Sequence, residues 1–355
     1  MSDISNKTAQ AGSKKFAGST SRKYNYYQPK GRKGTLYEDV TVDVQPDPER
    51  YLAQGWIISF PDGTPAYSDK WTKIKSSDWH KYRDPNGEWE RNHYTRQSSI
   101  EKQVSLTIKS AKDENQFAKL DNTWTKILQN HLGASKHPEY GIGMVFQSAQ
   151  RDGLSQMINN SLLINAADKL RYAQDVALYM GEIASMVELD ESAGKDNWLN
   201  NPIWQGVREV VETISASSDW SEQTFAINLV YEPLVGELFR SGFLMQYAAS
   251  HGDYVTPTLV STAEADYERN LDYSAEMFSV FFTDPKFGKE NIQVAEEWLK
   301  KYVPMCVKAA NLLQPVWSQP RVKVTTYAEA FQRADERFNS ILKHLNIGLP
   351  KGVNL

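Results

Sequence analysis

The sequence predicts an all-α fold, a bundle of long helices preceded by an extended N-terminal arm. Two observations support this. From Ser98 onward, apolar residues recur at helical spacing and prolines are few. Before it, prolines interrupt every helical pattern and large aromatic side chains recur. We expect three parts: a disordered tail over residues 1–23, which has little apolar material to bury, the arm over 24–97, and a helical domain over 98–355.

The proline- and aromatic-rich arm contains little that predicts regular structure. Residues 39–44 alternate polar and apolar side chains, which is typical of a short extended piece. A stretch this long and irregular is not expected to fold by itself. We interpret its large aromatic residues as anchors on another surface, either the body of this chain or a partner. The candidate subunit-interface anchors are Tyr26, Tyr27, Trp56 and Trp79.

The helical part divides at recognisable boundary signals. Asp219 is an N-cap candidate with a carboxylate three residues on, Gly252 follows a helical run, and Pro257 falls in a first turn. Pro233 and Pro304 fall inside helical patterns and are expected to kink or break them. The helices are expected over residues 98–132, 138–151, 153–188, 198–215, 219–250, 256–283, 287–313 and 326–346.

The segment 153–188 is apolar on more than one side, which is typical of a central helix. It carries Lys169 and Tyr172 at the spacing that a Glu-x-x-His pair has in ferritin-like diiron bundles. A charged Lys has no free lone pair, and Tyr is a poor ligand at neutral pH. The helix therefore resembles a diiron helix without the iron, and we interpret Lys169 and Tyr172 as vestigial metal-slot positions in a ferritin-like bundle.

A buried ammonium at Lys169 would need a partner, because an unpaired buried charge is costly. Glu232 or Glu237, on the 219–250 segment, is the expected partner. The neighbouring Asp168 is expected to belong to a solvated face or an i,i+4 pair, like Arg171 and Asp175.

The chain lacks the ligand set of a diiron enzyme, which needs two Glu-x-x-His pairs and two further Glu. The sequence has a single such spacing, at Glu90 and His93 in the arm, and we interpret it as a polar surface or interface pair. Nucleotide-binding glycine motifs, Cys-x-x-Cys and Gly-x-Ser-x-Gly are absent as well. We therefore assign no catalytic residue and no metal ligand to this chain. A Lys169→Glu, Tyr172→His variant is expected not to bind iron, since the remaining carboxylates and a second His are missing.

Composition narrows the class of protein further. A formal net charge of -4 and a pI near 5.9 argue against a nucleic-acid partner. The single cysteine, Cys306, excludes an intrachain disulfide, fits a reducing compartment and is expected to be core packing. No apolar run reaches the ~18 to 20 residues of a membrane span, and no secretory signal is recognisable, so we expect no membrane partner and a cytoplasmic location.

Short motifs in a fixed order resemble the hydroxylase beta (small) subunit of bacterial soluble diiron multicomponent monooxygenases, most closely the propane monooxygenase type. The resemblance runs from about residue 24 to 345, and its specificity lies in the order and spacing of many motifs. Among them are residues 37–48, Gln54-Gly55-Trp56, Asp78-Trp79-His80, Met157-Ile158-Asn159, Asn165-Ala166-Ala167, Asp219-Trp220, Leu234-Val235-Gly236, Gly252-Asp253-Tyr254 and Trp317-Ser318-Gln319-Pro320.

This resemblance implies a non-catalytic beta subunit that supports a homologous alpha subunit, which holds the diiron centre. It implies an (αβ)2 or, with a gamma subunit, (αβγ)2 assembly, a coupling protein, and a separate reductase that uses NADH, FAD and a 2Fe-2S cluster. The enzyme would hydroxylate small hydrocarbons or related small organic molecules with O2. The chain itself would bind no cofactor.

Two other hypotheses remain open from the sequence. One is a self-sufficient diiron oxidase or oxygenase, which the missing second Glu-x-x-His disfavours. The other is a helical scaffold unrelated to oxygenases. Iron analysis of the purified chain distinguishes a self-sufficient diiron enzyme from a beta subunit. Co-purification with a larger chain that has paired Glu-x-x-His motifs would exclude the unrelated scaffold.

Overall fold

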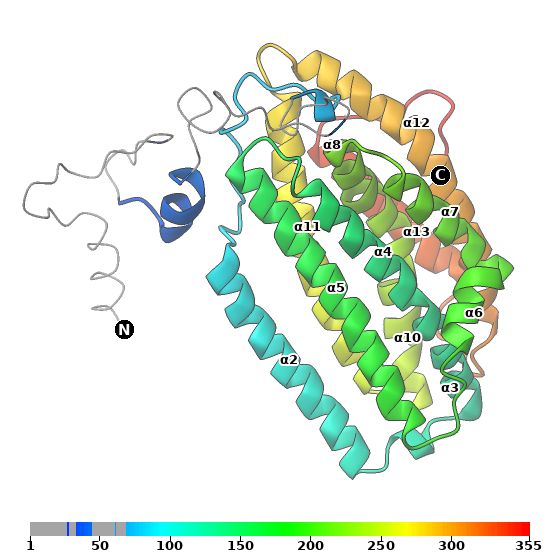
Figure 1. The fold of residues 1–355 in the computed structure, drawn as a ribbon. Coiled ribbons are helices and arrows are strands. Elements are labelled where there is room, and N and C mark those ends of the chain that lie inside the picture. The colour runs from blue at the N-terminus through cyan, green and yellow to red at the C-terminus, as the bar shows by residue number, and fades with distance from the viewer. Residues whose placement is uncertain (1–26, 28–32, 45–60, 62–68) are drawn as a thin grey trace, which may run out of the picture.

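The computed structural model describes residues 27, 33–44, 61 and 69–355, and the helices dominate it (Figure 1). These residues contain no strand. The long helices are α2 (Glu90–Asp113), α4 (Gly133–Ala149), α5 (Gln156–Ala184), α7 (Pro202–Ser215), α11 (Val255–Phe282), α12 (Gly288–Leu313) and α13 (Tyr327–His344). The shorter elements are η1 (Glu38–Val42), η2 (Asp69–Trp71), η3 (Phe117–Lys119), α3 (Asn122–Ile127), η4 (Leu128–Leu132), α6 (Ala193–Asn200), α8 (Trp220–Thr224), η5 (Phe225–Gly236), α9 (Glu237–Phe239), η6 (Arg240–Leu244), α10 (Met245–Tyr247), η7 (Ala248–His251) and η8 (Gln314–Ser318).

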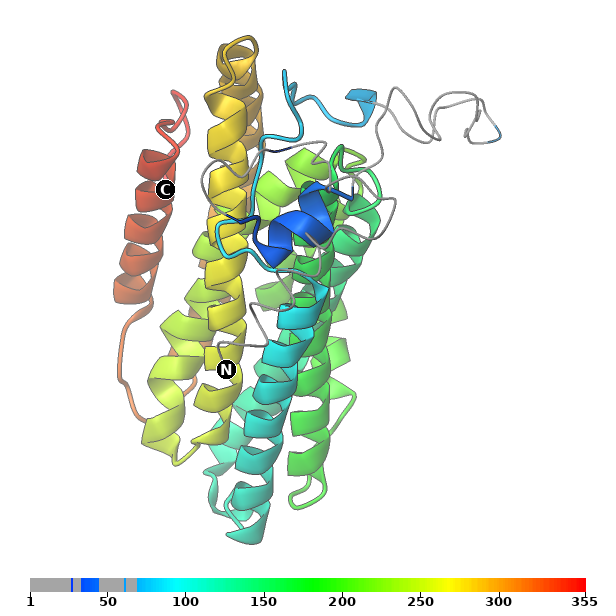
Figure 2. The ribbon, with the colours of Figure 1, turned by 90° about the vertical axis from the view of Figure 1, so that its left-hand side faces the viewer.

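Four helical runs close into a bundle: α4 packs on α5, α5 on α11, α11 on η5, and the α8–η5 run returns to α4. Outside this ring, α12 covers η5 and α7, and α13 also packs on η5. Helix α2 runs beside α5 and α11 at one edge of the bundle (Figures 1 and 2). The structure confirms an all-α bundle, with α5 in the central place that its apolar faces predicted.

Local signals fix several helix ends as expected. Asp219 accepts hydrogen bonds from the backbone amides of Ser221 and Glu222, which confirms its role as an N-cap. Gly252 has φ +75°, the left-handed conformation that ends a helix at least cost for glycine. Pro257 lies in the first turn of α11, where its missing donor is not needed.

Two helical expectations are wrong. The single helix expected over 98–132 is two helices, because Asn115 takes a left-handed conformation with φ 54° after α2, and Asp121 caps a new start at α3. Helix α2 also begins at Glu90, inside the range predicted for the arm. Pro304 lies inside α12, which continues through it, so the expected kink-or-break does not take the form of a break.

The other proline, Pro233, coincides with a departure from regular α-helix. It lies in η5, where the helix widens to a π-helix of 12 residues. A proline removes one backbone donor, and a π-type widening is one of the ways in which a helix accommodates the lost bond. The widened helix passes through the centre of the bundle, since every residue of η5 is buried.

The extended piece expected over 39–44 is also wrong, since η1 is a helical turn. No strand lies next to residues 39–44 among the described residues. Their alternating polar and apolar side chains therefore have no neighbouring strand with which to form a sheet. Instead the Thr41 hydroxyl donates to the Tyr37 carbonyl at 2.5 Å, and Val42 is fully buried, with η1 packed on α5.

Two further observations concern the chemistry of the body. Cys306 is fully buried in the core, where burial raises its thiol pKa well above the ordinary value. It is therefore core packing, as the sequence indicated. Among the described helices, none combines the length and apolar character needed to cross a membrane.

Candidate functional site

Charged side chains from four walls of the bundle meet in its interior. Glu139 comes from α4, Lys169 from α5, Glu232 from η5, Arg240 from η6 and Glu264 from α11. The first four are buried, and the Glu264 side chain is only 16% exposed. These five residues are called the charge cluster below.

The contacts in the charge cluster are direct. Lys169 Nζ lies 2.8 Å from Glu139 Oε2 and 2.5 Å from Glu232 Oε1. Arg240 donates from Nη1 to Glu139 Oε1 at 2.8 Å and from Nη2 to Glu232 Oε2 at 2.6 Å. Each of these two carboxylates therefore gives one oxygen to the ammonium and the other to the guanidinium, so that both carboxylates bridge the same two cations.

The third carboxylate completes the coordination of the guanidinium. Arg240 Nε donates to Glu264 Oε1 at 2.8 Å. All three kinds of guanidinium nitrogen are thus used, and the cluster sets three carboxylates against two cations. Charge-assisted bonds of this kind are what allows charged groups to remain inside a protein.

The electrostatics of the cluster favour the charged forms. Burial alone would lower the pKa of Lys169, but the charges of Glu139 and Glu232 outweigh it, and the pKa is raised. Burial alone would raise the pKa of Glu232, but the charges of Arg240 and Lys169 outweigh it, and the pKa is lowered. The interior therefore holds ionised partners at neutral pH.

Gly236 makes the close approach possible. It lies one helical turn from both Glu232 and Arg240, and a Cβ at this position would come within 2.4 Å of Glu232 Oε2 and 2.9 Å of Arg240 Nη1. A larger residue would displace the bridge between them. The glycine in the Leu234-Val235-Gly236 motif is therefore required by packing against charges.

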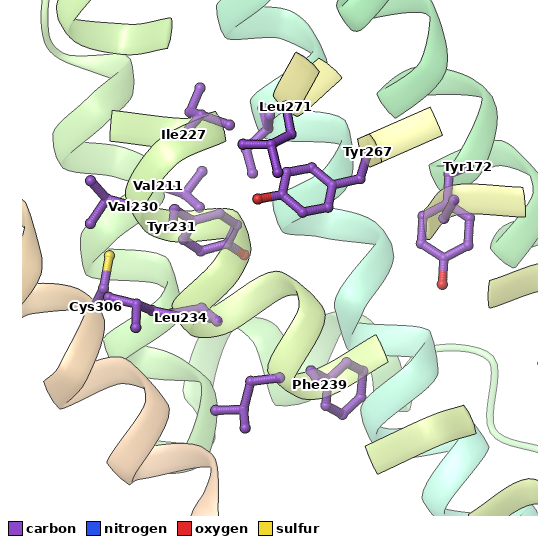
Figure 3. Close-up of a cluster of buried hydrophobic side chains, with 14 of the residues drawn as sticks. Tyr172, Val211, Ile227, Val230, Tyr231, Leu234, Phe239, Tyr267, Leu271 and Cys306 are labelled. Atoms are coloured by element: carbon purple, nitrogen blue, oxygen red, sulfur yellow. The ribbon is translucent and has the colours of Figure 1, made fainter. Parts of the chain in front are cut away.

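Two tyrosines follow the cluster at helical spacing. Tyr172 is three residues after Lys169 on α5, and Tyr267 is three residues after Glu264 on α11. Both are buried, and burial raises the pKa of each hydroxyl well above its usual range. Figure 3 shows both within the buried hydrophobic cluster, with the Tyr267 hydroxyl directed towards the segment of Ile227 and Tyr231. That hydroxyl donates to the Asn228 carbonyl at 3.0 Å.

The Tyr172 hydroxyl has no hydrogen-bond partner among the described residues. Burial dominates its raised pKa, and Arg240 and Glu139 are the nearest charged influences on it. The hydroxyl thus belongs to the surroundings of the charge cluster.

The cluster can be compared with a diiron bundle, which takes one Glu from each of two helices and a Glu-x-x-His pair from each of the other two. Here α4 and η5 contribute Glu139 and Glu232, while α5 contributes Lys169 with Tyr172 and α11 contributes Glu264 with Tyr267. That Lys169 and Tyr172 are vestigial metal-slot positions stays a prediction.

The residues present do not fit a diiron centre. The four oxygens of Glu139 and Glu232 are already bonded to Lys169 and Arg240, and both His positions hold Tyr. Within the described part of the chain, no group of three or more His, Cys, Asp or Glu residues could hold a metal ion. The arrangement can balance charge and hold helices together, and it offers no coordination set for redox chemistry.

Sequence reasoning found part of this cluster. The Lys169–Glu232 pair is confirmed, but the expected alternative Glu237 is wrong, since its carboxylate faces Arg337 at 3.5 Å. The statement that the remaining carboxylates are missing is also wrong, because Glu139 and Glu264 are present. The Glu-x-x-Tyr spacing at Glu264 was a signal that could have found it, whereas nothing local marks Glu139.

Asp168 differs from its expectation too. It is buried and accepts hydrogen bonds from Gln97 at 2.8 Å and Asn270 at 3.3 Å, so it joins α5 to α2 and α11. Its pKa is raised well above the ordinary value, first by burial and then by the charge of Asp266. The Arg171–Asp175 pair exists as expected, and Arg171 also donates to Asp266.

The other sequence candidates lie elsewhere. Glu90 is exposed at the start of α2, and His93 is buried 3.8 Å from Glu88 and from Asp168, so the two do not converge. Tyr27 donates to Asp39 at 2.8 Å. Trp79 packs edge-on against Phe281, with ring centroids 5.4 Å apart. Tyr26 and Trp56 lie outside the described residues.

Comparisons with known proteins point to one family. The family model described as Methane/Phenol/Alkene Hydroxylase matches residues 56–285. A propane 2-monooxygenase hydroxylase component small subunit from Gordonia sp. (strain TY-5) is 44% identical over 98% of this chain and 95% of the relative. A methane monooxygenase component A beta chain from Methylosinus trichosporium is 26% identical over 82% of this chain and 76% of the relative.

Solved structures show the same fold. A chain of phenol hydroxylase from Pseudomonas sp. OX1 aligns with a TM-score of 0.73 at 17% identity, covering 91% of this chain and 93% of the other. A chain of toluene 4-monooxygenase aligns with a TM-score of 0.68 at 19% identity, covering 84% and 99%.

Proposed function

This chain belongs to the methane/phenol/alkene hydroxylase family, and we propose that it acts as the small (beta) subunit of the hydroxylase component of a propane monooxygenase-like enzyme. The similarity to propane 2-monooxygenase small subunits spans nearly the whole chain and nearly the whole of each relative. The chain therefore contributes to oxygenation as part of a multicomponent system.

The observation that carries the assignment of roles is the charge cluster. A bundle with the diiron layout holds Lys169 and Arg240 between the carboxylates that metals would need. We infer that the diiron centre is in the partner alpha subunit and that this chain supplies no catalytic ligand. The alternative of a self-sufficient diiron oxygenase finds no support in this interior.

The remaining partners follow from the same proposal. A coupling protein and a reductase that carries FAD and a 2Fe-2S cluster would deliver electrons from NADH to the partner's centre, and a gamma subunit is a further candidate. The assembly is proposed to be (αβ)2 or (αβγ)2, located in the cytoplasm. The substrate class is small hydrocarbons and related small organic molecules, with propane first because two relatives that are 44% and 43% identical over 98% of this chain carry that name.

A surface for the alpha subunit is proposed on α2, α4 and α5. Large apolar side chains are exposed on these three neighbouring helices, and patches of this kind on a folded protein mark interaction sites. A groove of about 970 Å³ runs between α2 and α5. The exposed apolar residues are Tyr94, Leu106, Tyr140, Met144, Leu163 and Leu178. The arm anchors Tyr26, Tyr27, Trp56 and Trp79 belong to the same proposal.

Co-purification and iron analysis test the assignment. Expressed with a large chain that bears two Glu-x-x-His motifs, the tagged chain is expected to bring that chain down, and the iron is expected to follow the large chain after the two are separated. About two irons bound tightly to this chain alone would overturn the proposal. A stable monomer that does not bind the large chain would overturn the proposal as well.

A further inference from the structure

The charge cluster has the connectivity of a dinuclear centre. In a carboxylate-bridged pair of ions, each bridging carboxylate binds one ion with each oxygen. Glu139 and Glu232 do this with Lys169 Nζ and the Arg240 guanidinium, at contacts between 2.5 and 2.8 Å. The third carboxylate, Glu264, binds only one of the two cations, as a terminal ligand would.

We propose that Lys169 and Arg240 occupy the two cation positions of a carboxylate-bridged centre, so that the bundle folds around its three buried carboxylates without metal, and that loss of the ammonium opens a site for one divalent cation between Glu139 and Glu232. This inference concerns the folding of the chain itself and holds whatever the partner contains.

The energetics favour this role for the two cations. Three carboxylates inside one bundle would repel one another, and a buried charge without a counter-charge is strongly unfavourable. Lys169 and Glu232 have side chains 7% and 0% exposed, so water cannot replace the missing charge. An internal cation, a bound cation or a proton taken up by one carboxylate must balance them.

A second observation points to the same pocket. The Tyr172 hydroxyl is buried, lacks a hydrogen-bond partner among the described residues, and lies on the face of α5 that carries Lys169. The charges of Arg240 and Glu139 act on this hydroxyl, so an oxygen without a partner lies near the charge cluster, although as a neutral phenol it is a weak ligand. Carboxylate and other oxygen ligands suit Mn²⁺ better than soft thiophilic metals, so Mn²⁺ is the probe.

The test uses three versions of the full-length chain: wild type, Lys169→Met, and Lys169→Met with Glu139→Gln. Met replaces the length of the lysine without its charge, and Gln removes one carboxylate while keeping its shape. Apparent Tm is measured with EDTA and with Mn²⁺. With EDTA, Lys169→Met is expected to lower Tm by on the order of 10 °C, because the buried ion pairs of Lys169 with Glu139 and with Glu232 are both lost.

The double variant is expected to recover at least half of that loss, since its net charge again matches the wild type. Mn²⁺ is expected to raise the Tm of Lys169→Met by several degrees and to leave the other two unchanged. If Lys169→Met does not fold in EDTA, folding upon addition of Mn²⁺ supports the proposal, and failure to fold with it contradicts the proposal.

Three results would overturn the inference. They are a Tm for Lys169→Met equal to that of the wild type, a double variant no more stable than the single one, and an equal response of all three proteins to Mn²⁺. Each of these leaves the proposed subunit role intact, because co-purification with the large chain and its iron content are measured separately.

Discussion

At the scale of single residues, Gly236 shows how a side chain's absence can be a functional requirement. A Cβ there would lie 2.4 Å from a carboxylate oxygen of Glu232, which bonds to Arg240. The constraint comes from space, since Gly236 has no positive φ. Its role is to let Glu232 and Arg240, which lie one turn before and one turn after it, form an ion pair.

We expect Gly236→Ala to destabilise the chain by on the order of 2 kcal/mol, because the methyl group must displace a buried ion pair. Chemical denaturation measures this change in unfolding free energy. Gly181→Ala on α5 is the matched control, as nothing lies within 4 Å of its added Cβ. That variant should gain up to about 1 kcal/mol from helix propensity. Equal effects of the two substitutions would refute the packing argument.

Glu237, next to the charge cluster, is a carboxyl group whose environment favours the neutral form. Burial and then the charge of Glu264 raise its pKa from 4.5 to about 7, although Arg337 lies 3.5 Å away. Because the folded state then binds the proton more tightly than the unfolded one, this group contributes stability below about pH 4.5. That contribution is lost as the pH rises towards 7.

Glu237→Gln is therefore expected to remove a stability loss that the wild type suffers between about pH 4.5 and 7. The quantity to compare is the unfolding free energy of the variant minus that of the wild type. This difference should be larger at pH 8 than at pH 4.5 by on the order of 2 kcal/mol. Denaturation at the two pH values measures this. Glu336→Gln, at an exposed position of α13, is the control and should show no such pH dependence. The opposite slope for Glu237→Gln would show that Arg337 dominates.

At the scale of elements, α2 depends on a polar contact network where other helices use apolar packing. Few of its residues are buried. Arg96 donates to Glu88 at 2.8 Å and is paired with Asp266 on α11, while Gln97 donates to Asp168 on α5. The helix is thus attached to the bundle chiefly through charges and hydrogen bonds near its N-terminal half.

Arg96→Met should loosen α2 before the rest of the molecule. It leaves Asp266 and Glu88 with fewer buried partners, at a cost of about 3 kcal/mol. Amide hydrogen exchange is expected to rise by one to two orders of magnitude in α2 and much less in α4 and α5. Arg91→Met, at an exposed position of the same helix, is the control. Uniform acceleration across the bundle would show that α2 does not open separately.

The π-helix η5 is the element that brings the cluster together. Glu232 lies on it, next to Pro233, and Arg240 follows after the short α9. A wider turn changes which residues share a face, so Glu232, Gly236 and Arg240 line up towards Lys169. The proline was visible in the sequence, but the resulting alignment of charges depends on the three-dimensional path of the helix.

At the scale of the whole molecule, the exposed apolar residues on α2, α4 and α5 distinguish one part of the surface. Leu106 and Leu178 are 66% and 58% exposed. A double Leu106→Asp, Leu178→Asp variant should weaken binding of the large subunit at least tenfold and leave Tm nearly unchanged, since both side chains already face solvent. Affinity for the isolated large subunit measures this.

The matched control is Val322→Asp with Val324→Asp, whose side chains are 48% and 47% exposed in the loop between η8 and α13. It adds the same charges to an exposed apolar pair away from α2, α4 and α5. Binding should be unaffected. If both double variants weaken binding equally, net charge is responsible and the proposed surface is wrong.

The sequence alone determined the helical class, most helix positions, the Asp219 and Gly252 boundaries, the burial of Cys306 and the need of Lys169 for a carboxylate partner, which it narrowed to Glu232 or Glu237. These follow from local causes: periodicity, capping chemistry and the cost of an unpaired buried charge. The family resemblance rested on the order and spacing of short motifs, which can also be seen in the sequence.

Only the tertiary structure decided which distant residues share the interior. Glu139, Arg240 and Glu264 are 30, 71 and 95 positions from Lys169 along the chain, and no local pattern joins them. It also decided that a helical turn forms within the alternating residues 39–44 and that Asp168 is buried. The physical reason is common to all of these: burial, pairing and charge balance are properties of the assembled bundle, whereas spacing and propensity are properties of each segment.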